Sequence, residues 1–305
     1  MKARAQAHAN IALVKYWGKK DEERLIPQAS SLSVALDKLI TTTTVELGGS
    51  EDSFELDGRR ENPRRVRALL DAAGIHEKAL VVSRNDFPTA AGLASSASGF
   101  AALAVAACAA AGQKRTVEEL SALARLGSGS ATRSVPGGWA VWQGERARQV
   151  FPPEHLPLRC VIALCAAGPK DVGSRDGMRL TKETSPYHAA WIEQCRHDLP
   201  QALISLSGRD LRSLGELAEK NALRMHADAL AADPPLLYWQ PATVACLLAL
   251  RTSPRLGWAT IDAGPHVVAL CAPENAARVD ALFRDIPGVE EVLVCAPAGG
   301  ARVLP

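Results

Sequence analysis

The sequence carries almost no net charge. Its 305 residues include 35 Lys and Arg against 33 Asp and Glu, which leaves a formal charge of +2. A protein that binds RNA or DNA through many phosphate contacts has a clear excess of basic residues. The RNP-type aromatic motif of RNA-binding sheets is absent as well. We therefore expect no nucleic-acid partner, and an RNA-contacting module is the weaker hypothesis.

Long apolar runs are also missing. The longest, Phe100–Ala111, lies between two glycines and is shorter than the ~20 residues needed to cross a bilayer. Near the N-terminus, the apolar stretch Ile11–Val14 is too short for the core of a signal peptide. These two observations predict a cytoplasmic protein with no membrane partner.

Closely spaced cysteines are absent too. The seven cysteines form no C-x-x-C pair, and their number is odd. Most of them lie in apolar runs such as VIALC and LVCAP, which is typical of buried, reduced thiols. Neither the cysteines nor the seven histidines show metal-ligand spacing. We predict no metal site made by protein side chains, and a zinc enzyme is the weakest alternative.

What the chain does have is the composition of a globular protein with a substantial core, at 47% apolar and 22% charged residues. Its length allows two domains of ordinary size. Proline density rises in FPPEHLPL (151–158), and a new strand pattern begins directly afterwards. We therefore predict an N-terminal domain over residues 1–155 and a C-terminal domain over 156–305.

Apolar periodicity and turn residues predict a mixed α+β fold in both halves. A capping box of Thr116 and Glu119 marks one helix start, and Pro63 and Gly74 lie near the two ends of another helix. The strands expected are 41–47, 53–60, 79–88, 137–144, 159–167, 257–264, 266–272 and 289–297. The helices expected are 62–74, 94–111, 116–130, 186–207, 209–232, 240–251 and 274–284.

Residues 88–97, PTAAGLASSA, form the first of three stretches suited to binding anions. Gly92 lets the backbone approach a ligand closely, and Ser95 and Ser96 stand near a helix start. Free N–H groups and the helix dipole favour an anion there. The pattern fits equally well a helix of small residues that packs tightly against a neighbour.

The second stretch is LGSGSATRSVPGG (126–138), which combines Ser128, Ser130 and Ser134 with Arg133. An arginine can grip a carboxylate or phosphate through two parallel hydrogen bonds. Taken alone, this stretch reads more simply as a polar loop between a helix and a strand.

The third stretch is NIALVKYWGKKDEE (10–23), in which Lys15 and Lys19 follow an apolar strand. We interpret Lys20 to Glu22 as a solvated charge run. Lys15 and Lys19 become stronger candidates for anion binding when the other two stretches are considered. Together, the three predict a nucleotide site and a small, highly charged substrate.

Six segments, in order along the chain, resemble the mevalonate diphosphate decarboxylase family of the GHMP kinase superfamily. NIALVKYWGKKDE is similar to the family's N-terminal signature, and SSLSVALD with TTTT (30–44) follows it. FPTAAGLASSASGFAAL resembles its phosphate loop and helix. SGSATRS (128–134) and TIDAGPH (260–266) fall where the family has its substrate loop and catalytic aspartate, and KDVGSRDGM (170–178) resembles a further substrate segment.

The resemblance implies a two-lobed GHMP-kinase-like α+β fold, with an S5-like N-terminal lobe, a ferredoxin-like C-terminal lobe and a cleft between them. It also implies the reaction. ATP phosphorylates the tertiary 3-hydroxyl of 5-diphosphomevalonate, and loss of that phosphate with CO₂ gives isopentenyl diphosphate. ATP and Mg²⁺ are the implied cofactors, and a homodimer is the implied assembly.

The same resemblance assigns roles to individual residues. Asp262 would lie nearest the 3-hydroxyl, Lys15 would stabilise the phosphate in transit, and Arg133, oriented by Asn10, would hold the carboxylate. The substrate-binding set it implies is Tyr16, Lys19, Ser128, Ser130, Arg133, Ser174 and Arg175. The ATP-binding set it implies is Ala91, Gly92, Leu93, Ala94, Ser95 and Ser96.

Some features leave alternatives open. Gln28-Ala29 and His266 depart from the pattern expected of the family, and His266 either replaces Asn harmlessly or alters the region round Asp262. A decarboxylase acting on 5-phosphomevalonate, or a kinase that phosphorylates without decarboxylating, would share most of these motifs. The five arginines of RRENPRRVR (59–67) are interpreted as a solvated helix face and kept out of the site.

Overall fold

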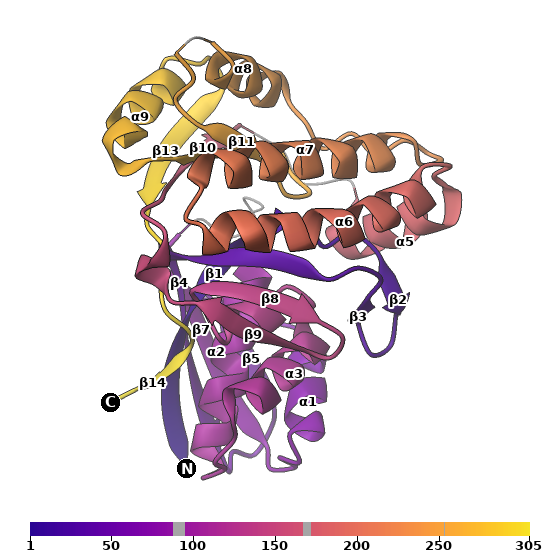
Figure 1. The fold of residues 1–305 in the computed structure, drawn as a ribbon. Coiled ribbons are helices and arrows are strands. Elements are labelled where there is room, and N and C mark those ends of the chain that lie inside the picture. The colour runs from indigo at the N-terminus through magenta and orange to yellow at the C-terminus, as the bar shows by residue number, and fades with distance from the viewer. Residues whose placement is uncertain (88–94, 167–171, 253) are drawn as a thin grey trace.

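Two sheets organise the chain (Figure 1), in a computed structural model that describes residues 1–87, 95–166, 172–252 and 254–305. The first sheet has the strand order β14-β1-β4-β7-β5-β6, with β8 paired to β4 and β9 paired to β8. Its strands are β1 (Lys2–Val14), β4 (Ser31–Leu47), β5 (Ser53–Leu56), β6 (Arg59–Glu61), β7 (Ala79–Asn85), β8 (Trp139–Gln143), β9 (Arg146–Phe151) and β14 (Arg302–Leu304). A separate hairpin pairs β2 (Lys19–Asp21) with β3 (Ile26–Pro27).

Four helices from the first half accompany this sheet: α1 (Arg64–Ala72), α2 (Ser95–Ala110), α3 (Val117–Gly127) and α4 (Ala131–Ser134). Helix α2 packs on the alternate alanines of β1, Ala5 and Ala7, within one buried cluster. Small residues on both surfaces let the backbones come close. The tight-packing interpretation of the alanine-rich run is therefore correct for the body of α2, while its first turn faces a cavity.

The start of α3 forms as its sequence predicts. Thr116 Oγ1 accepts the Glu119 N–H at 3.2 Å, and Glu119 Oε2 accepts the Thr116 N–H at 2.7 Å. This reciprocal pair satisfies two N–H groups that a helix start otherwise leaves free. The capping box thereby fixes where α3 begins, and with it the chain that leads into the Ser128–Ser134 stretch.

The second sheet is antiparallel, with the order β11-β12-β10-β13. Its strands are β10 (Arg159–Cys165), β11 (Trp258–Thr260), β12 (Val267–Cys271) and β13 (Val289–Cys295). The helices of this half are α5 (Ser174–Thr184), α6 (His188–Ser207), α7 (Leu211–Leu230), α8 (Pro241–Leu250) and α9 (Ala276–Arg284), and two 3-10 turns span Pro153–His155 and Pro273–Asn275. Figure 1 shows α6 lying next to β1 of the first sheet and α7 stacked on α6. Helices α8 and α9 lie at the top of the view, farthest from the first sheet.

A continuous apolar cluster joins the two halves. It combines Leu13 of β1 and Leu32 of β4 with Ile162 of β10 and Leu214 of α7. A second cluster lies between the second sheet and helices α8 and α9, around Phe283. Because side chains from both sheets share the first cluster, its burial fixes the relative position of the two lobes.

The end of the chain returns to the first sheet. Strand β14 pairs antiparallel with β1, with Val303 opposite Ala5. The turn at Gly137 has a φ of +62°, and a Cβ there would lie 2.2 Å from the Gly299 carbonyl carbon. Only glycine fits this close approach. Residues past Cys295 therefore complete the N-terminal lobe, although they follow the C-terminal lobe in sequence.

The predicted mixed α+β fold is confirmed, and most expected elements are present within the described residues. Strand β4 extends N-terminally from the predicted 41–47 to Ser31, while β2, β3, β9, β14 and α5 were not predicted at all. Residues 128–134, read as a loop, include the short helix α4. The predicted end of a strand at Pro88 lies outside the described residues. Within the parts of the chain that are described, no helix has the length and apolar character to cross a membrane.

Candidate active site

One cavity of about 630 Å³ is lined by most of the residues that the sequence predicts for the site. Its wall comes from β1 and the chain after it, the start of α2, the chain through α4, the start of α5 and the turn after β11. The nominated residues that line it are Asn10, Lys15, Tyr16, Lys19, Ser95, Ser96, Ser128, Ser130, Arg133, Ser174, Arg175 and Asp262. Ala91, Gly92, Leu93 and Ala94 lie outside the described residues. We call this space the large cavity.

The large cavity is strongly basic. Among its described lining residues, Asp262 is the one carboxylate. The basic lining residues are Lys15, Lys19, Arg65, Arg133 and Arg175. In a protein of near-neutral total charge, this concentration of cations creates a local field that attracts a ligand with several negative charges.

Lys15 and Asp262 form an ion pair at the wall of the cavity. Lys15 Nζ lies 2.6 Å from Asp262 Oδ1, and the exposed fractions of the two side chains are 1% and 33%. Burial lowers the pKa of Lys15, and the neighbouring Asp262 opposes that shift. Thr260 Oγ1 donates to the Ala12 carbonyl at 3.2 Å, which ties β11 to β1. This link between strands brings together two residues that are 247 positions apart.

Arg133 is held by neutral oxygen acceptors rather than by a carboxylate. Its Nε donates to Asn10 Oδ1 at 3.2 Å, and its Nη1 donates to Ser31 Oγ at 2.6 Å. Asn10 is fixed in turn, since its Nδ2 donates to Ser134 Oγ at 2.7 Å. Burial lowers the pKa of Arg133 to about 10, so its charge persists at neutral pH. The predicted contact of Asn10 with Arg133 is present, whereas Ser31 was not predicted.

A row of hydroxyls connects α2 with the chain before α4. Ser96 Oγ lies 3.2 Å from Ser128 Oγ, and Ser128 Oγ lies 3.2 Å from Ser130 Oγ. Between them, a Cβ on Gly129 would approach Tyr16 Oη to 2.8 Å. Burial raises the pKa of Tyr16, so its hydroxyl stays neutral and can donate. The missing side chain at Gly129 lets Tyr16 and Trp142 pack against the backbone here, which places the Tyr16 hydroxyl beside the serine hydroxyls.

Residues Lys15–Lys19 form the chain after β1, which we call the lysine loop. Gly18 has a φ of +128°, and a Cβ there would meet Gln28 Oε1 at 2.6 Å. Lys19 is buried, and its Nζ lies 2.5 Å from Glu22 Oε2. The interpretation of a solvated charge run holds for Lys20 and Glu22, which are both exposed, although Glu22 also pairs with the buried Lys19.

A smaller cavity, of about 370 Å³, adjoins the large one. Apolar side chains of Phe54, Phe100 and Leu103 line it, together with polar groups such as Asn62. Three residues line both cavities: Arg65, Ser95 and Ser96. An apolar pocket joined to a basic one across a helix start fits a nucleotide, with its base in the small cavity and its phosphates at the junction.

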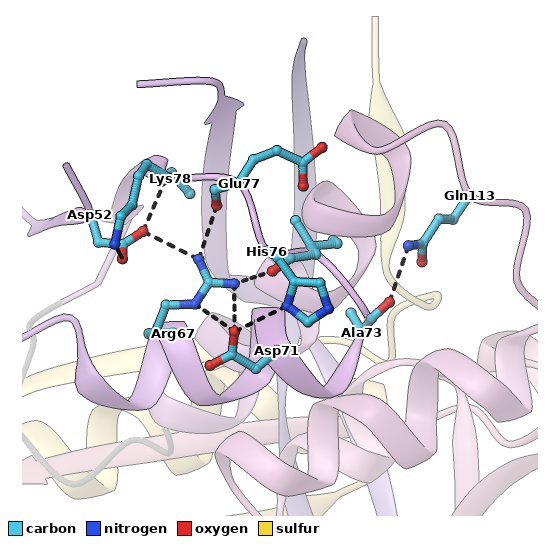
Figure 2. A network of polar contacts seen from close by, with 10 residues as sticks. Asp52, Arg67, Asp71, Ala73, His76, Glu77, Lys78 and Gln113 are labelled. Carbon is cyan, nitrogen blue, oxygen red and sulfur yellow. Dashed lines mark hydrogen bonds and ion pairs between the residues drawn. The ribbon is translucent and has the colours of Figure 1, made fainter. Parts of the chain in front are cut away.

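The arginines of 59–67 do not share one environment: Arg59, Arg60, Arg64 and Arg65 are exposed, as a solvated face predicts, whereas Arg67 is partly buried. Arg67 belongs to a structural network: its Nη1 donates to the Glu77 carbonyl at 3.0 Å, and its Nε to Asp71 Oδ1 at 3.0 Å (Figure 2). Arg65 instead reaches both cavities, with its guanidinium 4.6 Å from the centre of the Phe100 ring. Residues two positions apart on a helix, such as Arg65 and Arg67, project from different sides of it. Sequence alone gives no signal for which side faces the ligand.

The two departures from the family pattern have structural partners. Gln28 Oε1 lies 2.9 Å from His188 Nε2, and His188 Nδ1 lies 2.8 Å from Asp228 Oδ2. His266 Nδ1 accepts the Cys165 N–H at 3.1 Å, which ties the turn carrying Asp262 to the end of β10. Neither Gln28 nor His266 is among the described residues that line the large cavity.

The thiols match the prediction from their sequence context. All seven cysteines are buried and free. Across the described part of the chain, no group of three or more His, Cys, Asp or Glu side chains is placed to hold a metal ion.

Known proteins match the chain along most of its length. A diphosphomevalonate decarboxylase-like N-terminal domain matches residues 7–150, and a mevalonate 5-diphosphate decarboxylase C-terminal domain matches residues 160–293. The diphosphomevalonate decarboxylase of Homo sapiens is 36% identical over 92% of this chain and 80% of its own.

Solved structures agree in fold. Mevalonate diphosphate decarboxylase from Staphylococcus aureus has a TM-score of 0.92 and 34% identity, covering 100% of this chain and 98% of its own. A complex of MDDEF with MVAPP, AMPPCP and magnesium has a TM-score of 0.92 and 37% identity, covering 100% and 99%. Fold and site thus define a two-domain protein of the GHMP type. The chain belongs to the diphosphomevalonate decarboxylase family.

Proposed function

We infer that this chain catalyses the ATP-dependent decarboxylation of 5-diphosphomevalonate to isopentenyl diphosphate, with release of ADP, phosphate and CO₂. The observation that carries the inference is the Lys15–Asp262 pair beside Arg133 in a basic cavity that adjoins an apolar pocket. Family membership supports this reaction, and a relative of the same fold has been solved in complex with MVAPP, AMPPCP and magnesium.

In the phosphorylation step, we propose that Asp262 contacts the tertiary 3-hydroxyl, as base or as orienting group. A tertiary alcohol is a crowded nucleophile, so holding it in line with the γ-phosphate supplies much of the rate. The Lys15 ammonium, 2.6 Å from Asp262, would stabilise negative charge on the phosphate in transit.

In the decarboxylation step, Arg133 would hold the substrate carboxylate. Loss of the 3-phosphate leaves positive charge at C3. The bond between C2 and the carboxylate carbon then breaks to release CO₂, and its electron pair forms the double bond between C2 and C3. The neutral partners Asn10 and Ser31 fix the guanidinium without cancelling its charge. We assign Arg133 to positioning, because too strong a grip on the carboxylate would oppose its departure.

The diphosphate of the substrate has no reacting bond. We propose that the hydroxyls and cations that line the cavity near Ser128 bind it, which aligns the reacting carbon. The residues proposed are Tyr16, Lys19, Ser128, Ser130, Ser174 and Arg175, all of which line the large cavity.

ATP phosphates would meet the start of α2 at Ser95 and Ser96, with residues 91–94 as proposed backbone donors. We add Arg65, which lines both cavities, as a contact to these phosphates. Mg²⁺ would neutralise charge on the phosphates. The site suits an ion held chiefly by phosphate oxygens and water, because it offers serine hydroxyls and a single described carboxylate.

The experiment is turnover with ATP, Mg²⁺ and 5-diphosphomevalonate, following ADP and CO₂ together, with Asp262→Asn in parallel. We expect equal release of both products and a fall in kcat of about 10²- to 10⁴-fold in the variant. ADP without CO₂ would indicate a kinase that stops at the 3-phosphate. Turnover with 5-phosphomevalonate and none with 5-diphosphomevalonate would indicate a decarboxylase that acts on the monophosphate.

The assembly and setting are also proposals. We propose a homodimer, a cytoplasmic location and a domain division at 155/156, from which the residues past Cys295 depart because they return to the first sheet. Seven free, buried thiols fit a reducing compartment, and the division falls in the gap between residues matched by the two domain models. Sedimentation of the purified protein at two concentrations tests the dimer, which a single species of about 32.3 kDa would contradict.

A further inference from the structure

Side chains from three helices of the C-terminal half form hydrogen bonds with the backbone of the lysine loop. The Lys15 N–H donates to Asn221 Oδ1 of α7 at 2.8 Å. Trp191 of α6 donates its Nε1–H to the Trp17 carbonyl at 3.0 Å. Lys182 of α5 donates to the Lys19 carbonyl at 2.9 Å. The loop's backbone is thus bonded on one side while Lys15, Tyr16 and Lys19 line the large cavity.

The side-chain amide of Asn221 is hydrogen-bonded at both its oxygen and its nitrogen. It is fully buried, and its Nδ2 donates to Asp198 Oδ2 at 2.7 Å. Asp198 also accepts from Gln194 at 2.8 Å and from Arg224 at 3.2 Å. The carboxylate can only accept, so it fixes the amide of Asn221 with its nitrogen toward α6 and its oxygen toward the loop. The opposite orientation would set like groups against each other at both ends.

We propose that Asn221 is a positioning residue for Lys15. The Lys15 side chain starts from the atom next to this hydrogen-bonded N–H and ends 2.6 Å from Asp262. Fixing the backbone at that point fixes where the buried ammonium lies relative to the transferred phosphate. The inference rests on the proposed role of Lys15, and it assigns to α6 and α7 a part in catalysis although Asn221 does not line the cavity.

The test exchanges the two ends of the Asn221–Asp198 bond. In Asn221→Asp, one oxygen still accepts the Lys15 N–H, but the other faces Asp198 Oδ2 where the 2.7 Å bond was, and like charges repel there. Adding Asp198→Asn restores a donor and an acceptor with the same total charge. We expect kcat to fall about 10- to 100-fold in the single variant and to return to within about threefold in the double variant.

Three further readouts separate positioning from general stability. KM for both substrates should change far less than kcat, since the loss lies in phosphate transfer. Amide hydrogen exchange at Lys15 should speed up in Asn221→Asp and slow again in the double variant. Cys195→Ala is the matched control, because Cys195 Sγ touches Asn221 Nδ2 at 3.8 Å without contacting Lys15. It should alter melting temperature and leave kcat unchanged.

Asn221→Ser provides a second route if Asn221→Asp does not fold, because a serine hydroxyl can bond within its own helix. It should show the same loss of kcat. The proposal is overturned if either folded single variant keeps kcat within about twofold, or if the double variant regains stability but not kcat. A wild-type protein that releases no ADP and CO₂ would instead overturn the proposed function, so the two failures are distinct.

Discussion

At the scale of single residues, burial lowers the pKa of Lys15 and Arg133, which line the large cavity, and different features keep each of them charged. Lys15 is buried and its pKa is lowered, yet Asp262 beside it helps to keep the ammonium protonated. Arg133 is equally buried, but its high intrinsic pKa leaves it charged with neutral partners only. Arginine at 133 and lysine at 15 are therefore not interchangeable, because each charge is maintained in a different way.

Arg65 offers a test of the nucleotide site. Replacing it with Gln removes a cation that lines both cavities. We expect KM for ATP to rise about tenfold, as expected for the loss of one charge-assisted contact, with KM for 5-diphosphomevalonate changing less. Arg64→Gln on the same helix is the control, because Arg64 is not among the lining residues. Equal effects from both substitutions would contradict the assignment.

His226 predicts how stability depends on pH. Burial lowers its pKa to about 4 from an ordinary value of 6.5. The unfolded chain therefore binds more protons than the folded chain between these values, and stability falls as pH drops through that window. The loss from this residue reaches about 3 kcal/mol at the acid end.

Urea unfolding at pH 7 and near pH 4 measures this loss, and His226→Gln should reduce it. His76, whose side chain is 79% exposed, is the matched control. His76→Gln should leave the acid loss as it is in the wild type. An equal acid loss in wild type and His226→Gln would refute the assignment.

At the scale of elements, close packing between helices shapes the small cavity. Gly127 at the end of α3 lies directly on the Phe100 ring of α2, where an added Cβ would come within 1.9 Å of Phe100 Cδ1. The Phe100 ring also lines the small cavity. The contact of α2 with α3 therefore determines the space offered to a nucleotide base.

Gly127→Ala should force the Phe100 ring out of place. We expect a destabilisation of about 1–3 kcal/mol, as for other overpacked sites, with a higher KM for ATP. Denaturant unfolding and ATP titration measure the two effects. Gly208→Ala is the control, because a Cβ there meets its nearest atom at an ordinary 3.5 Å. Unchanged stability in Gly127→Ala would show that the helices separate freely at this contact.

At the scale of the whole molecule, the chain's last residues hold the two lobes as one unit. Residues beyond Cys295 bond back to the first sheet: Gly138 N–H donates to the Ala298 carbonyl at 2.8 Å, and Ala298 N–H donates to the Ala35 carbonyl at 2.9 Å. Ala301 N–H donates to the Val135 carbonyl at 2.9 Å. The first lobe is therefore incomplete without the segment that follows the second.

Deleting residues 297–305 should destabilise the protein. At ~1 kcal/mol for each net hydrogen bond, the three bonds above account for about 3 kcal/mol. The deletion also exposes the edge of β1, so we expect association at high concentration. Urea unfolding and sedimentation check both effects. Removing the exposed Pro305 alone should change neither, and an equally stable, monodisperse truncated protein would contradict this role.

The sequence by itself determined the local features of this protein. The capping box at Thr116, the apolar strand before Lys15 and the small residues opening α2 follow from neighbours along the chain. Motif residues such as Arg133 and Asp262 were found because the chain resembles a known family. The tertiary structure alone decided that Asn221 meets Lys15 across 206 positions and that Arg65 rather than Arg67 reaches the cavities. Such contacts depend on strand pairing and helix rotation fixed by burial across the whole core, which no short stretch of sequence records.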